Sequence, residues 1–132
     1  MKRILLFCGL LLATTFSFTA HAQKSGWPVI ASKADFSKAV TDFDNFVIAG
    51  NTTAALSKID DINAMISAQM RYGKYKIKDA IDASDAPRIA DAKKNIMDKW
   101  TIYNDMSNLV GNPTANKSLI DTKLSDFMKV MD

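Results

Sequence analysis

Hydrophobic side chains recur every three or four positions through most of the chain between residues 52 and 110. This period places them along one side of an α-helix, and a group of helix-capping residues interrupts it once, near the middle. Each series needs a partner that covers its apolar side, so the two helices are predicted to pack as one long hairpin. The first series is Leu56, Ile59, Ile62, Ile66, Met70, Gly73, Ile77 and Ile81, and the second is Ile89, Ile96, Trp100, Tyr103, Met106 and Val110.

Capping and stop residues give limits to the first two helices. The sequence predicts a first helix over about residues 33–49, because Ser32 is suited to cap its start and Gly50 to end it. The second helix is predicted to begin at Thr52 or Thr53 and to reach about Ala83.

Gly73 is the weak point of the second helix, since glycine costs about 1 kcal/mol relative to alanine in a helix interior. The hydrophobic period nevertheless continues in phase from Met70 to Ile77. This continuity predicts one helix, kinked at the glycine. A break at residues 72–74 is the alternative.

The third helix is predicted to start after a cap at Ser84 or Asp85, with Pro87 in its first turn, where proline is tolerated. The sequence Gly111-Asn112-Pro113 is a stop signal, so this helix should end at Val110. A fourth helix is expected over about residues 114–130.

Four amphipathic helices joined by short connections are typical of an antiparallel four-helix bundle. We therefore predict an all-α fold, with helices two and three as a long central hairpin and with shorter helices one and four covering only part of its length. No internal repeat or linker divides residues 33–132, which are expected to form one domain.

The N-terminal residues have the three parts of a secretory signal peptide. Lys2 and Arg3 form a basic start, residues 4–12 are strongly apolar, and Ala20-His21-Ala22 places small residues where signal peptidase requires them. The apolar run is shorter than the ~20 residues of a membrane-spanning helix. Residues 1–22 are thus predicted to be cleaved, and the protein to be exported, periplasmic or secreted, with a bacterial origin favoured by the compact basic leader.

Residues 23–32 follow as an extended N-terminal arm. Pro28 prevents a helix there and biases Trp27 towards an extended conformation. We expect the indole to lie across the bundle and to cover part of its core.

Cleavage changes the charge and the chemistry of the chain. Removal of Lys2 and Arg3 leaves 15 of the 17 basic residues against 14 acidic ones, a net charge of +1, which gives no indication of nucleic-acid binding. Cys8 and His21, the only Cys and the only His, leave with the leader, and the whole chain lacks Glu. These absences argue against thiol enzymes, His-based triads, Cys/His zinc sites and Glu-based di-iron bundles. We expect no enzyme activity, no resident cofactor and no metal, and the mature chain should not span a membrane.

The best candidate for a binding surface lies in the second helix. Residues 71–78 contain four cations interleaved with two tyrosines, and at helical spacing Arg71, Lys74, Tyr75 and Lys78 project to one side. Such a surface is suited to an acidic protein or an anionic envelope component. Asp79 and Asp82 follow directly, so an ordinary solvated helix surface is the competing interpretation. The sequence therefore predicts a small exported bundle that works by binding.

The alternative function is haem or metal binding through methionine. Six methionines remain after cleavage, several of them on the hydrophobic stripes, where they either fill the core or could ligate haem or Cu(I). The layout of an exported four-helix chain of this length resembles the soluble cytochrome b562 type of bundle, in helix number and order only. That family holds haem between a Met near its start and a His near its end. Here Val40 and Met128 occupy roughly those regions, and the mature chain has no His.

Overall fold

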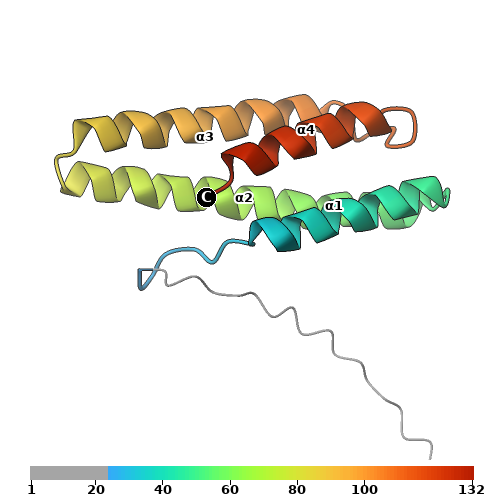
Figure 1. Ribbon diagram of the computed structural model, residues 1–132, viewed down its shortest axis with the longest axis horizontal. Helices are drawn as coiled ribbons and strands as arrows, with labels where there is room; N and C mark the ends of the chain where they lie inside the picture. Colours follow the sequence, from blue (N-terminus) through green and yellow to red (C-terminus); the bar gives the residue numbers. More distant parts are fainter. Residues whose placement is uncertain (1–23) are drawn as a thin grey trace, which may run out of the picture.

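A computed structural model describes residues 24–132 of the chain, and all regular structure in this part is α-helical (Figure 1). The four helices are α1 (Lys33–Ile48), α2 (Thr52–Asp82), α3 (Ala86–Ser107) and α4 (Lys117–Val130). Within this part of the chain, no helix combines the length and the apolarity that a membrane span requires. The predicted signal peptide and its cleavage site lie outside the described residues.

The helices pack as a bundle in which each contacts two others. α2 packs against α1 and α3, and α4 packs against α3 and α1. The 31 residues of α2 and the 22 of α3 make these the longest helices, compared with 16 in α1 and 14 in α4. Figure 1 shows that α1 and α4 accompany the α2–α3 pair along only part of its length. The all-helical class, the bundle packing and the relative helix lengths agree with the prediction from sequence.

The core lies where all four helices meet. Phe36 of α1 and Phe127 of α4 are fully buried and stack with their ring centroids 5.4 Å apart. Ile62 and Ile66 of α2 and Met106 of α3 close the same cluster. Because fully burying each such side chain contributes roughly 1.5–3 kcal/mol, this cluster is the main source of stability.

The buried side of α3 differs from the prediction. The residues that α3 buries are Ala92, Lys99 and Met106, which are spaced by seven. Trp100, which we expected on the apolar stripe, has 48% of its surface exposed, and nearby Met97 has 60%. α3 is covered by α2 on one side and by the short α4 on another, and Met97 and Trp100 lie outside both covered sides.

Side-chain caps define the start of three helices. Ser32 and Asp35 form a reciprocal capping box at α1, as the sequence indicated for Ser32. Asp85 caps α3 by accepting a hydrogen bond from the backbone N–H of Arg88 at 3.1 Å. Asn51 caps α2 in the same way through the N–H of Ala54, so the helix begins at Thr52.

α2 is continuous through Gly73, as the hydrophobic period predicted. The glycine is buried, and a Cβ atom there would lie 2.6 Å from Cγ1 of Ile96 in α3. The absence of a side chain therefore lets α2 and α3 approach closely, which compensates for the low helix propensity of glycine.

The connection between α3 and α4 is longer than predicted. α3 ends at Ser107 and not at Val110, and α4 begins at Lys117 and not at Thr114. Asparagine side chains compete with the helix for backbone groups here. The amide of Asn116 donates to the carbonyl of Leu109 at 2.9 Å, and Asn112 accepts a hydrogen bond from the N–H of Ala115 at 3.1 Å.

Candidate functional site

The four residues predicted to form a binding surface lie on the outward side of α2, in its second half. Arg71, Lys74 and Lys78 are exposed, and Tyr75 has 42% of its surface exposed. Their spacing of three and four residues places them next to each other on the helix. We call these four residues the α2 patch.

The cations of the α2 patch differ in their pairing. Lys78 forms an ion pair with Asp82, one turn later, and the hydrogen bond to Asp82 raises the pKa of the Lys78 ammonium. Arg71 and Lys74 form no ion pair with any residue in the described range 24–132. The positive charge of the patch that is not locally balanced therefore belongs to Arg71 and Lys74.

The aromatic residue of the patch contacts the N-terminal arm. The indole of Trp27 meets the ring of Tyr72 edge-on at 5.0 Å between centroids, and the ring of Tyr75 at 6.0 Å. Trp27 and Tyr72 are half-buried. The arm thus lies across α2, beside the exposed cations. Trp27 lies across the bundle as expected, but it packs on tyrosines of α2 and is not among the residues packed against the core cluster.

Asp79 of α2 bonds both to the arm and to α3. Its carboxylate accepts hydrogen bonds from Lys24 of the arm at 2.5 Å and from Arg88 of α3 at 2.9 Å. These two cations hold the pKa of the Asp79 carboxyl below its usual value. The ammonium of Lys24 also lies 5.5 Å from the ring centroid of Trp27, close enough for a cation–π interaction.

A small cavity of about 290 Å³ lies between the arm and α2. Its walls combine two aromatic rings with two carboxylates and one ammonium group. The lining residues are Ser25, Gly26, Trp27, Tyr75, Lys78, Asp79 and Asp82.

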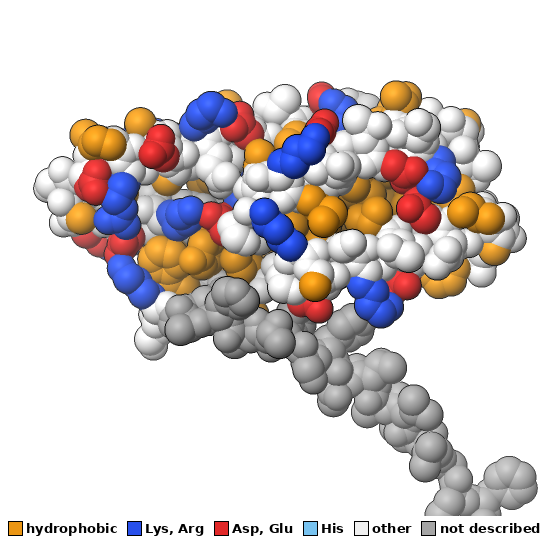
Figure 2. Space-filling model, viewed as in Figure 1, with side chains coloured by type: hydrophobic (Ala, Val, Ile, Leu, Met, Phe, Trp, Pro, Cys, Tyr) orange, Lys and Arg blue, Asp and Glu red, His pale blue; other side chains and the backbone are white. Residues whose placement is uncertain are grey.

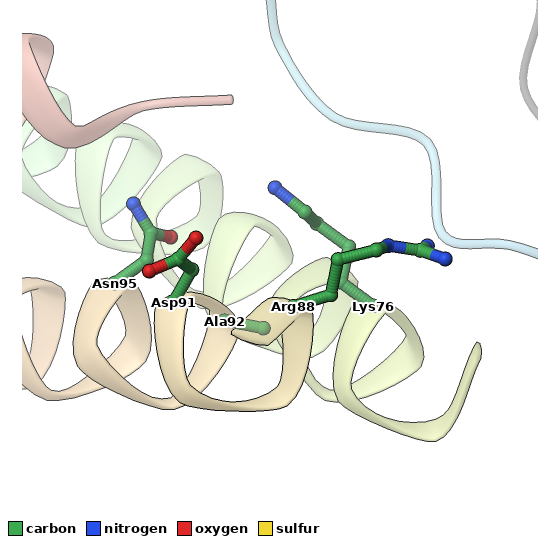
Figure 3. Close-up of a pocket in the computed structure, with 5 residues that line it drawn as sticks. All are labelled: Lys76, Arg88, Asp91, Ala92 and Asn95. Carbon is green, nitrogen blue, oxygen red and sulfur yellow. The ribbon is translucent and has the colours of Figure 1, made fainter. Parts of the chain in front are cut away.

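A second cavity, of about 390 Å³, lies in the groove between α2 and α3 beyond the end of α4 (Figure 3). The labelled side chains come from both helices, with Asp91 and Asn95 side by side on α3. Three polar groups that line this cavity already have partners. Lys76 bonds to Asp132, Asn95 donates to the carbonyl of Val130, and Arg88 donates to the carboxylate of Asp79. The bonds of Lys76 and Asn95 hold Val130 and Asp132 against the groove, so the cavity offers few free groups to a ligand.

A buried polar cluster that the hydrophobic pattern did not predict lies at the centre of the bundle. Lys99 of α3 is fully buried, and its ammonium donates to the carboxylate of Asp132 at 2.5 Å and to the side-chain oxygen of Gln69 at 3.0 Å. Burial lowers the pKa of Lys99, although the bond to Asp132 opposes this effect. The available signal was spacing, since Lys99 lies seven residues from both Ala92 and Met106 on the buried side of α3.

The methionines are mostly part of the packing. Met106 and Met131 are buried in the core, and Met65, Met70 and Met128 pack against it. The interior between α1 and α4 is filled by the stacked rings of Phe36 and Phe127. Val40 and Met128, the positions indicated by the cytochrome-like layout, are half-buried beside this cluster. The residues present therefore do not fit a haem between these helices, and thioether ligation elsewhere stays a prediction without support.

No charge of one sign dominates the visible surface. Figure 2 shows Lys and Arg side chains interspersed with Asp over this face, with no single basic area. Within residues 24–132, no group of three or more His, Cys, Asp or Glu side chains is placed to hold a metal ion. Comparison of the chain with protein-family models, with curated proteins and with solved structures found no match.

Proposed function

We propose that this protein is an exported helical-bundle module that acts by binding, not by catalysis, and that the α2 patch contacts an anionic partner. The partner is an acidic protein surface or an anionic component of the cell envelope. The observation that carries the proposal is the pair of exposed cations, Arg71 and Lys74, which have no ion-pair partner among residues 24–132 and lie beside the half-exposed ring of Tyr75.

The composition of this surface supports a role in recognition. Arg, Tyr and Trp are the residues most enriched at energetic centres of protein interfaces. Here Arg71 is close to Tyr75, and Trp27 lies against the same ring. An exposed aromatic side chain supplies contact area, and neighbouring unbalanced cations select an anionic partner and accelerate its approach.

The bundle supplies a rigid base for such a surface. In our proposal the four helices run antiparallel, so that α2 is held on both sides by α1 and α3 while Arg71 and Lys74 stay exposed on its outer side. Export through the leader at residues 1–22 would bring this outer side into contact with envelope components.

Binding to defined anionic probes tests the proposal. The first probe is a vesicle of phosphatidylcholine with phosphatidylglycerol, compared with one of phosphatidylcholine alone, and the second is poly-aspartate as a stand-in for an acidic protein surface. We expect binding to at least one anionic probe and its loss in Arg71→Ser/Lys74→Ser.

The matched control is Lys93→Ser/Lys94→Ser, which removes the same number of charges from the exposed surface of α3. It should bind like the unmodified protein. Absence of binding to both anionic probes, or equal loss in the two double variants, would contradict the proposal.

A further inference from the structure

The N-terminal arm is seated on α2 through two side chains spaced by three residues. The indole of Trp27 packs on the rings of Tyr72 and Tyr75, with centroid distances of 5.0 and 6.0 Å. The ammonium of Lys24 reaches the carboxylate of Asp79 at 2.5 Å. A turn in the arm, with the N–H of Trp27 donating to the carbonyl of Lys24 at 3.1 Å, brings the two side chains to the same side.

The receiving surface matches these two groups chemically. Tyr72 and Tyr75 present an aromatic wall to an indole, and Asp79 presents a carboxylate to an ammonium group. Arg88 positions that carboxylate by donating to its second oxygen at 2.9 Å. We call Tyr72, Tyr75 and Asp79 the arm site.

Nothing but side chains holds the arm in the arm site. Among the described residues, no backbone hydrogen bond joins residues 24–31 to a helix. The Lys24 side chain is 63% exposed, and Val29 is exposed as well. An exposed ion pair contributes only about 0–1 kcal/mol. The contacts of the half-buried Trp27 with Tyr72 and Tyr75 add about 0.5–1.5 kcal/mol for each aromatic pair. Release of the arm therefore costs a few kcal/mol, less than unfolding of the bundle.

We propose that the arm site is a docking site for an extended segment of a partner protein that carries a basic residue three positions before an aromatic residue. The chain's own arm occupies the site as an intramolecular competitor. The arm site shares Tyr75 with the α2 patch. The two proposals are tested separately, because docking of the segment depends on Tyr72 and Asp79, whereas the anionic partner depends on Arg71 and Lys74.

Competition by the arm should weaken the binding of a partner segment by a measurable amount. A partner segment binds only molecules whose arm has left the site, so its apparent affinity falls by the fraction of molecules in that state. Removing the two anchoring side chains of the arm should therefore strengthen binding of a segment added in trans.

The test uses the unmodified protein and the variant Lys24→Ser/Trp27→Ala, each isotope-labelled for NMR. The probe is a blocked synthetic peptide with the sequence of residues 24–30, which carries the required Lys and Trp. We expect saturable shifts of the amide signals of Tyr72, Tyr75 and Asp79 in the variant, and an apparent affinity about tenfold weaker in the unmodified protein. NMR detects millimolar binding, so weak docking is still measured.

Two controls separate docking from other effects. The same peptide with Trp replaced by Ala should cause no saturable shift, and Tyr72→Ala/Asp79→Asn introduced into the arm variant should remove the response. Circular dichroism of each variant verifies that the helices are intact.

Equal affinity for the unmodified protein and the arm variant would overturn the proposal, as would the absence of shifts on α2 in the folded arm variant. Concentration-dependent dimers of the unmodified protein, lost in the arm variant, would overturn it in favour of arm exchange between two copies. Binding of anionic probes is measured with the arm in place, so failure of the peptide test leaves the proposed function intact.

Discussion

The ammonium of Lys99 lies 2.5 Å from the carboxylate of Asp132 with its entire side chain buried. Three further bonds support this ion pair. Gln69 accepts from the Lys99 ammonium at 3.0 Å and from the backbone N–H of Asp132 at 3.1 Å, and Lys76 contacts the other carboxylate oxygen. The last residues of the chain are thereby fixed to α2 and α3, because a buried charge must keep its partner.

Removal of this carboxylate should destabilise the protein strongly. In Asp132→Ala, Lys99 would be left as a buried charge without its counter-ion, which we expect to lower the free energy of unfolding by about 3 kcal/mol. Urea denaturation measures this change. Asp126→Ala is the matched control, because Asp126 pairs only with exposed Lys129, and it should change stability little.

Similar effects of the two substitutions would show that the charge of Lys99 does not depend on Asp132 in the folded protein.

The same carboxylate predicts a stability difference that depends on pH. Burial acts to raise the pKa of Asp132, but hydrogen bonds from Lys76 and Lys99 outweigh it and hold the pKa below the usual 3.8. Asp132 therefore binds a proton more readily in the unfolded chain than in the folded one. The stability that its carboxylate contributes is complete above pH 3.8 and is lost as the pH falls through the lower pKa of the folded state.

Denaturation midpoints of the unmodified protein and of Asp132→Asn, measured across this acid range, test the sign. The difference between them should shrink with decreasing pH, since the other carboxylates contribute equally to both proteins. A constant or growing difference would mean that the folded-state pKa of Asp132 is not lowered.

Gly73→Ala should destabilise the protein although alanine favours helices by about 1 kcal/mol over glycine. The new Cβ would lie 2.6 Å from Cγ1 and 2.9 Å from Cδ1 of Ile96, which is a β-branched residue with little rotamer freedom. Overpacking of this kind costs about 1–3 kcal/mol. Thermal unfolding is measured for Gly73→Ala, Ile96→Ala and the double variant. Gly73→Ala should destabilise the protein less when residue 96 is already alanine, and additive effects of the two substitutions would rule out the close approach.

Ser32→Ala should cost about 1 kcal/mol of stability, because it removes the capping box with Asp35 at the start of α1. Ser37→Ala provides the comparison: Ser37 is exposed inside the same helix, where alanine is the better helix former. Chemical denaturation should give a loss for the first variant and none for the second. An equal response would show that the cap does not stabilise the folded protein.

The helices were largely predictable because hydrophobic spacing and local caps determine them. Ser32, Gly50 and Pro87 each act on their immediate neighbours, and the predicted limits of α1 and α2 agree with the structure to within a residue or two. The end of α3 was predicted wrongly because Asn112 and Asn116 form side-chain bonds that a count of hydrophobic positions does not register.

Tertiary contacts were much less accessible from the sequence. Helical spacing brought Arg71, Lys74, Tyr75 and Lys78 to one side of α2, but it gave no information on which cations keep their charge unbalanced. The partnership of Lys99 with Asp132 joins residues far apart in the chain. The alignment of Lys99 with buried positions of α3 indicated that this lysine is buried. Its partner Asp132 could not be predicted, because that contact depends on how α4 ends beside the groove between α2 and α3.

The central claim is that the charges of Arg71 and Lys74 carry the binding of this protein to an anionic partner, and the most direct test is the salt dependence of that binding. For the anionic probe that binds more tightly, affinity is measured over a range of salt concentrations for the unmodified protein, Arg71→Ser/Lys74→Ser and Lys93→Ser/Lys94→Ser. We predict a steep decrease with salt for the unmodified protein and the Lys93/Lys94 variant, and a much shallower one for the Arg71/Lys74 variant. The same steep dependence in all three proteins would contradict the account.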